Sequence, residues 1–168
     1  MKLTDLLSLE KWTEFEKEVH ARSGLDASIF NTDGIRITDY KKWANRICPV
    51  IKDNDKGQAF ICAVAHMNLA TQARRTKIPV IEECDAGLLK LVVPLFVEDQ
   101  FIGAFGACGL LLDDGEVDTF MINKTIDTEE ETLEELSSGI DAITSKAAAS
   151  LARFIENRLA EIVNDYKH

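Results

Sequence analysis

The sequence predicts an α+β protein: an antiparallel pair of strands flanked by helices, with one helix at the N-terminus and a long one at the C-terminus. Residues 84–112 contain two apolar runs joined by a polar turn at residues 98–100, which is the pattern of a β-hairpin. Apolar residues recur at helical spacing before and after this hairpin. Because both strands are apolar at nearly every position, we expect both faces to be covered, by the helix around Cys62 and His66 or by a ligand.

Length and composition indicate a single globular domain. The chain has 168 residues, of which 46% are apolar and 29% are charged, which suffices for one hydrophobic core. We expect the core over residues 5–127 and a helix for dimerisation and signalling over residues 128–165. No apolar run is long enough to span a membrane and no secretory signal opens the sequence, so a cytoplasmic location is expected.

The negative charge is concentrated in one segment. The formal net charge is −10, and residues 113–135 hold ten acidic residues and one lysine. The remainder, with nineteen acidic and eighteen basic residues, is nearly neutral. We interpret residues 113–135 as a solvated acidic surface, and nucleic acid is not expected as a partner because it binds basic surfaces.

The first third of the chain predicts a helix followed by two short strands. Residues 8–22 have the spacing of an amphipathic helix, with Ser8 as its N-cap and Gly24 at its end. Residues 25–29 and 35–38 are expected to be strands joined by an Asp-Gly turn.

The region before the hairpin predicts two further helices. Residues 40–47 are expected to form a short helix, and Pro49 is expected to hold the chain extended after it. A longer helix is expected over residues 55–75. Its apolar stripe is formed by Phe60, Val64 and Met67. Cys62 and His66 lie four residues apart, so their side chains share a different face of this helix.

The C-terminal segment predicts one long helix over residues 128–165. Thr128 and Glu131 have the spacing of a capping box. The apolar residues that follow at helical spacing are Leu136, Ile140, Ile143, Ala147, Leu151, Phe154, Ile155, Leu159 and Ile162. So wide a stripe can pack on the protein's own sheet or against a second subunit, and we expect a homodimer through the terminal helices.

Enzyme signatures are absent from the sequence. Gly103, Gly106 and Gly109 lie inside a predicted strand and open no helix, so they do not form a phosphate loop. We interpret them as bulges or as points where another group approaches the backbone closely. Cys62 and His66 could form a nucleophile pair, but they lack a third, orienting group. We therefore do not expect an enzyme.

Metal binding is a more specific hypothesis for these residues than catalysis. The four cysteines, Cys48, Cys62, Cys84 and Cys108, could hold an iron–sulfur cluster, and a mixed set that includes His66 could hold zinc or a haem. No CxxC pair occurs. Two alternatives stay open: packed thiols in the core, and a reversible redox pair.

The order of several short motifs resembles the PocR sensory-domain family over residues 5–160. The matching residues are Cys48, Gly57, Cys62, Cys84-Asp85-Ala86-Gly87-Leu88, Val93-Pro94-Leu95 and Ile102-Gly103-Ala104-Phe105. The resemblance implies a PAS-like fold, with a central antiparallel sheet flanked by helices. It also implies sensing of small organic molecules in bacterial signalling proteins, where such domains accompany an output module. This chain is then an excised sensor or a stand-alone partner of an output protein.

Two departures from the family pattern bear on the ligand. Asp85 stands where the family usually has His, and Cys108-Gly109 stands where it usually has Gly-Gln. The resemblance implies that the replaced His and Gln are polar pocket groups, so the family's ligand does not carry over to this chain, and the added thiol favours a metal or cluster. We expect a pocket between the 84–112 hairpin and the 55–75 helix that signals through the terminal helices. The alternative is a non-sensory module that recruits a partner through its C-terminal helix.

Overall fold

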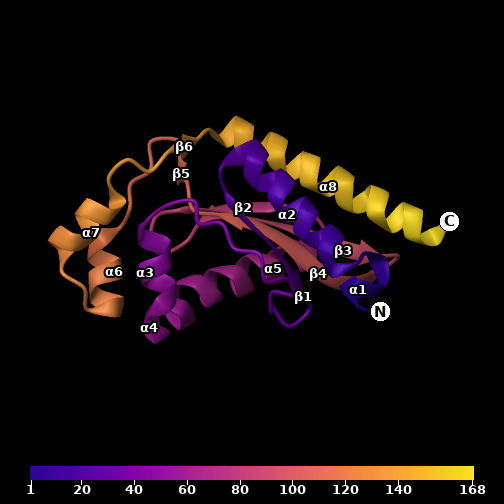
Figure 1. Ribbon diagram of the computed structural model, residues 1–168, viewed down its shortest axis with the longest axis horizontal. Coiled ribbons are helices and arrows are strands. Elements are labelled where there is room, and N and C mark those ends of the chain that lie inside the picture. Colours follow the sequence, from indigo (N-terminus) through magenta and orange to yellow (C-terminus); the bar gives the residue numbers. More distant parts are fainter.

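The computed structural model describes all residues 1–168 and is built around a four-stranded antiparallel sheet (Figure 1). The strands, in the spatial order β1-β4-β3-β2, are β1 (Asp26–Asn31), β4 (Gln100–Cys108), β3 (Leu89–Val97) and β2 (Val80–Glu83). The predicted hairpin is confirmed as β3 and β4, and Glu98 in the connecting turn has a φ of 56°. β2 was not predicted. The fold class is therefore α+β, as expected.

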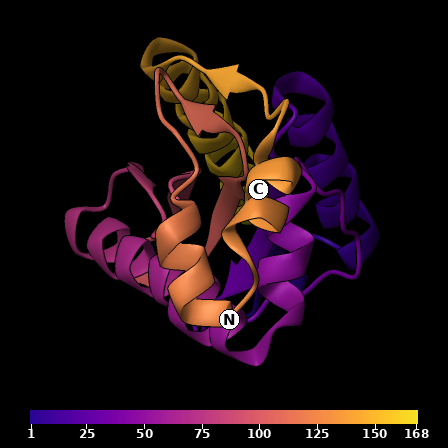
Figure 2. The same ribbon diagram turned by 90° about the vertical axis from the view of Figure 1, so that its left-hand side faces the viewer.

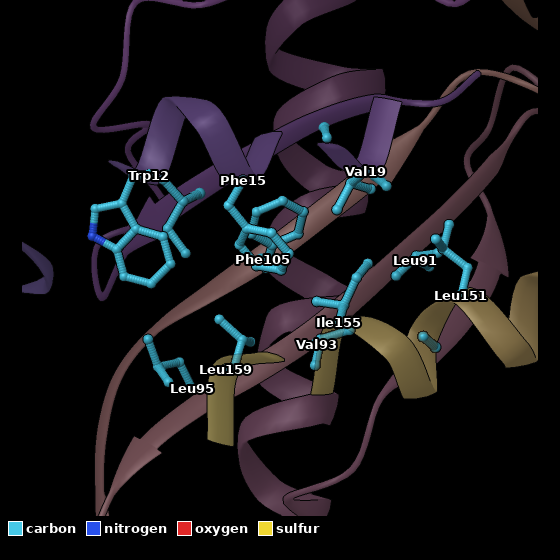
Figure 3. Close-up of a cluster of buried hydrophobic side chains, with 14 of the residues drawn as sticks. Trp12, Phe15, Val19, Leu91, Val93, Leu95, Phe105, Leu151, Ile155 and Leu159 are labelled. Atoms are coloured by element: carbon cyan, nitrogen blue, oxygen red, sulfur yellow. The ribbon is translucent and has the colours of Figure 1, made fainter. Parts of the chain in front are cut away.

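Helices cover both faces of the sheet. On one face lie α2 (Leu9–Ser23) and α8 (Ser145–Lys167), with the short α1 (Leu3–Leu6) beside them, and on the other lies α5 (Val64–Thr76) (Figure 1). The largest hydrophobic cluster fills the first interface. Figure 3 shows it, with Trp12, Phe15 and Val19 of α2 and Leu151, Ile155 and Leu159 of α8 packed on Leu91, Val93, Leu95 and Phe105 of the sheet.

Further elements gather at one end of the sheet, in the region that faces the viewer in Figure 2. They are α3 (Ile47–Asp53), α4 (Asp55–Gly57), the π-helix η1 (Gln58–Ala63), α6 (Thr119–Ile126), α7 (Glu130–Ser137) and a parallel strand pair, β5 (Leu111–Leu112) and β6 (Ala142–Ile143). A second hydrophobic cluster holds α3, η1, α6 and α7 together. None of the protein's helices combines the length and apolar character needed to cross a bilayer.

The N-terminal helix has the predicted caps. The Ser8 side chain accepts a hydrogen bond from the Lys11 backbone N–H at 3.3 Å, and Gly24 ends α2 with a φ of 77°. The predicted strand over residues 35–38 is wrong, because this segment makes a single isolated bridge between Arg36 and Phe30. Beyond that bridge the chain leaves the sheet edge, and the Thr38 hydroxyl donates a hydrogen bond to the Glu16 carboxylate of α2.

Residues 40–47 do not form the predicted helix; α3 begins at Ile47 instead. Pro49 lies within this helix rather than in extended chain. It is the third helical residue, in the first turn, where a missing N–H removes no intrahelical hydrogen bond. The Asn45 side chain accepts hydrogen bonds from the N–H groups of Ile47 at 3.0 Å and Cys48 at 2.7 Å, and so sets the start of α3.

The helix expected over residues 55–75 is present as the succession α4, η1 and α5, but its predicted apolar stripe faces solvent. Phe60, Val64 and Met67 are 61%, 39% and 61% exposed. The buried side chains are Ile61, Ala65, His66, Leu69 and Ala73. Two of them are alanines, which let α5 approach the sheet closely.

The single helix expected over residues 128–165 is two helices, α7 and α8. Glu129, not Thr128, precedes α7, and it makes no side-chain cap. Gly139 has a φ of 73°, and the chain then enters β6. Thr144 caps α8 by accepting from the Ala147 N–H at 3.0 Å. The apolar stripe of α8 packs on the protein's own sheet, which was one of the two arrangements considered.

Candidate functional site

A cavity of about 220 Å³ lies between α5 and the sheet, at the end where β3 begins and β4 ends. All five residues singled out in the sequence line it: Cys48, Cys62, His66, Cys84 and Cys108. They come from α3, η1, α5, the segment after β2, and β4. Helix periodicity placed Cys62 and His66 on one face, and both do face this cavity. Their part in ligand binding stays a prediction.

Strand alternation explains which sheet residues line the cavity. Successive side chains of a strand point to opposite faces. In β3, Leu89 and Leu91 join the core under α2 and α8, so Lys90 points to the α5 face. In β4, Ala107 joins that core and Cys108 points to the cavity. Lys90 and Cys108 are paired in register, so their side chains are neighbours on this wall.

Asn45 fastens α3 to the end of β4. Its amide nitrogen donates to the Gly109 carbonyl at 2.6 Å and lies 3.1 Å from the Cys48 sulfur. Gly109 has a φ of 109°, and a Cβ at this position would lie 2.8 Å from the Cβ of Ala44. A glycine is therefore required for this close approach, as the sequence suggested.

The π-helix η1 brings Gln58 and Cys62 to the cavity wall. A π-turn inserts one extra residue per turn, and such turns are frequent at functional sites. Gly57, at the start of this segment, lies against α3, where a Cβ would come within 2.1 Å of the Ile51 carbonyl oxygen.

The Cys-Asp-Ala-Gly-Leu segment is a tight turn that joins β2 to β3. The Cys84 N–H donates to the Leu88 carbonyl at 2.8 Å, and Gly87 has a φ of 82°. The Cys84 thiol lines the cavity. Asp85, which stands where the family usually has His, is exposed and does not line the cavity.

His66 is a neutral, buried imidazole. It is 5% exposed and stacks on Phe30, with 3.9 Å between the ring centroids. Burial, together with the positive charges of Lys90 and Lys52, lowers its pKa from 6.5 to about 3. Neither ring nitrogen has a hydrogen-bond partner. A neutral imidazole offers one donor and one acceptor, and neither is satisfied in His66.

Charged side chains, which the sequence analysis did not single out, also reach the cavity. Lys41 forms an ion pair with Asp26 at 2.6 Å, whereas Lys52 and Lys90 form none. Lys90 is only 9% exposed, and its Nζ lies 5.4 Å from the Phe30 ring centroid. The position of Lys90 in the sequence could have identified it as a candidate site residue. A lysine inside an otherwise apolar strand has to point away from the core or have a partner for its charge.

The cysteines are free and surround the cavity without forming a compact ligand set. No group of three or more His, Cys, Asp or Glu side chains is arranged to hold a metal ion. Burial raises the pKa values of the Cys48, Cys62 and Cys84 thiols. They are therefore protonated at neutral pH, whereas metal ligation requires the thiolate.

Residues 32–46 form a loop that closes one side of the cavity through Trp43, Lys41 and Gly34. The fully buried carboxylate of Glu16 in α2 holds this loop. It accepts hydrogen bonds from the Thr38 hydroxyl at 2.5 Å and from a β1 backbone N–H at 2.9 Å. Burial raises the pKa of Glu16 despite these bonds.

A cavity between a sheet and helices, lined by apolar side chains and a few convergent polar groups, has the usual form of a small-molecule site in proteins. A family model described as "Sensory domain found in PocR" matches residues 5–165, and the chain belongs to this family of sensory domains. The predicted resemblance is thereby confirmed. No curated protein matches the chain, and no solved structure does.

Proposed function

We propose that this protein senses a small organic molecule that binds in the cavity between α3, η1, α5 and the sheet. The observation that carries the proposal is the set of buried polar atoms around this cavity without hydrogen-bond partners. They are both ring nitrogens of His66, Oε1 of Gln58 and Oδ1 of Asp26. Buried polar groups are normally satisfied, and a small molecule with hydrogen-bonding groups could satisfy those around this cavity.

The connection from the cavity to α8 supports signalling through the terminal helix. Cys108 on the cavity wall is followed directly by β5, which pairs with β6 immediately before α8. The Asp113 carboxylate then accepts hydrogen bonds from the backbone N–H and the hydroxyl of Ser145, the first residue of α8. A ligand that displaces the end of β4 would therefore displace the start of α8.

The proposal is tested by screening small metabolites for binding. Trp43 lines the cavity while the other tryptophan, Trp12, is fully buried, so tryptophan fluorescence reports on the cavity. Ala63 lines the cavity and Ala59 on the same π-helix is exposed. Ala63→Phe should abolish binding of any hit, and Ala59→Phe should preserve it. Equal binding by both variants would place the ligand elsewhere.

An iron–sulfur centre is the second candidate because all four cysteines line one cavity, although they form no compact ligand set in this arrangement. The thiolates of such a centre would carry negative charge, which Lys90 and Lys52 at the same cavity would balance. Anaerobic purification followed by an absorption spectrum and iron analysis tests it. A colourless, iron-free protein that still binds an organic molecule would eliminate this candidate.

The protonation states of Cys62 and His66 argue against their acting as a catalytic pair. A thiolate nucleophile needs a lowered cysteine pKa and a base that accepts the proton. Here burial raises the pKa of Cys62, and His66 has a pKa of about 3. The pair is therefore thiol and neutral imidazole at pH 7, and rapid alkylation of Cys62 would contradict a sensory role without catalysis.

The homodimer and the recruitment of an output protein are proposals that concern the terminal helices. The apolar stripe of α8 is already buried on the sheet, so either partner would have to contact its other faces. Met1 and Tyr166 line one shallow surface hollow, so both ends of the chain lie together, at the sheet end opposite the cavity (Figure 1). Sedimentation of the full chain with and without ligand tests self-association.

A further inference from the structure

We propose that the ligand is a small organic anion, a carboxylate that also carries a hydrogen-bonding group, held by Lys90 inside the cavity with Lys52 at its rim. This inference rests on the proposed small-molecule binding and specifies its chemistry. It follows from the balance of charge around the cavity, the burial of Lys90 and the unpartnered polar atoms.

Positive charge exceeds negative charge at the cavity. Three lysines face it, Lys41, Lys52 and Lys90, and the carboxylate of Asp26 is paired with the first of them. Asp33 and Lys52 are both exposed residues at the cavity edge, where solvent screens their charges, so Lys90 is the nearly buried charge without a carboxylate partner. The Cys48, Cys62 and Cys84 thiols are protonated and the His66 imidazole is neutral, so none of them offsets the charge of Lys90.

Lys90 provides the strongest indication. It is a nearly buried residue on the cavity wall that forms no ion pair, and its Nζ lies 5.4 Å from the centroid of the Phe30 ring. Glu82 lies opposite it in register on β2, yet Glu82 is exposed and forms no ion pair with it. A buried charge without a partner is costly. An anion beside Lys90 would remove this cost through a charge-assisted hydrogen bond.

The other polar atoms indicate a second functional group on the ligand. His66 offers one donor and one acceptor, and Oε1 of Gln58 and Oδ1 of Asp26 are acceptors. A carboxylate alone accepts hydrogen bonds and so satisfies none of these acceptors. A hydroxyl or amide on the same molecule would donate hydrogen bonds to these acceptors. The volume of about 220 Å³ lies below the roughly 300–1,000 Å³ of pockets for drug-sized ligands, so the ligand is of metabolite size.

The test compares carboxylates with their uncharged counterparts on the full chain. Acetate, propionate, lactate and succinate, each paired with its amide, are titrated by calorimetry and by Trp43 fluorescence. We expect a carboxylate with a hydrogen-bonding substituent to bind at least about tenfold more tightly than its amide. Lys90→Met, which removes the charge and keeps the chain length, should weaken this binding by about tenfold or more.

Matched variants separate the inference from folding defects. Lys56 is exposed and does not line the cavity, so Lys56→Met should bind like the wild type. Lys90→Met should not lower the unfolding midpoint of the ligand-free protein, because it removes an unpaired buried charge. If amides bind as tightly as carboxylates, or if Lys90→Met binds the carboxylate unchanged, the anion inference is overturned while small-molecule sensing stands. If no carboxylate binds saturably, the anion inference is overturned as well. If none of the amides binds either, the proposal of small-molecule sensing is itself contradicted.

Discussion

Lowering the pH should destabilise this protein through His66 by an amount that the structure allows us to calculate. Its pKa is about 3 in the folded state, against a usual value of 6.5. Between these values the unfolded chain binds a proton and the folded protein does not, so stability falls as the pH falls through this window. From pH 7.5 to pH 5.5 the loss attributable to His66 is about 1.4 kcal/mol.

The assay is urea unfolding at both pH values for the wild type and for His66→Gln. Other titrating groups contribute equally to both proteins, so the difference between their pH dependences isolates the imidazole. His168, exposed at the C-terminus, provides the control variant His168→Gln, which should behave like the wild type. If the wild type and His66→Gln lose the same stability between pH 7.5 and pH 5.5, His66 is not held neutral by its surroundings and the description of the cavity wall is wrong.

Three further outcomes follow from buried groups and caps. Glu16→Ala removes the acceptor for the Thr38 hydroxyl and for the Ile29 N–H. It should cost about 2–4 kcal/mol in urea unfolding and speed hydrogen exchange in residues 32–46, whereas Glu16→Gln should recover part of the loss; an unchanged exchange rate would contradict the anchoring role. Thr144→Ala removes the N-cap of α8 and should cost about 1 kcal/mol, and a neutral result in thermal melts would show that the cap is dispensable. Because burial raises the pKa of three cavity thiols, iodoacetamide at pH 7.5 should label them far more slowly in the folded protein than in urea; equal rates would show that the cavity is open to solvent.

Local signals in the sequence were reliable where one short stretch determines the structure. The hairpin followed from two apolar runs around a polar turn, and it is present as β3 and β4. The Ser8 cap and the Gly24 end of α2 are also as predicted. The cysteines are a different case, because they are spread over residues 48–108 and only the folded chain brings all four to one cavity.

The errors have a common origin in contacts between distant segments. The apolar rhythm over residues 128–165 continues through a region where β6 pairs with β5, and this pairing interrupts the helix. Both faces of the helical segment over residues 58–76 carry apolar side chains, and the sheet buries the face of Ile61 and Leu69 rather than that of Phe60, Val64 and Met67. Neither outcome is encoded in the periodicity of the segment itself.

The sequence by itself determined the central hairpin, the caps of the first helix and the membership of the sensory-domain family, since each depends on residues close together in the chain or on their order along it. Only the tertiary structure decided the chemistry of the cavity. Lys41, Lys52 and Lys90 come from a loop, a helix and a strand, and they meet Asp26 because the sheet and α3 converge at one end. The balance of charge at that point is a property of the folded arrangement, because Coulomb interactions depend on distances in space rather than on separation along the chain.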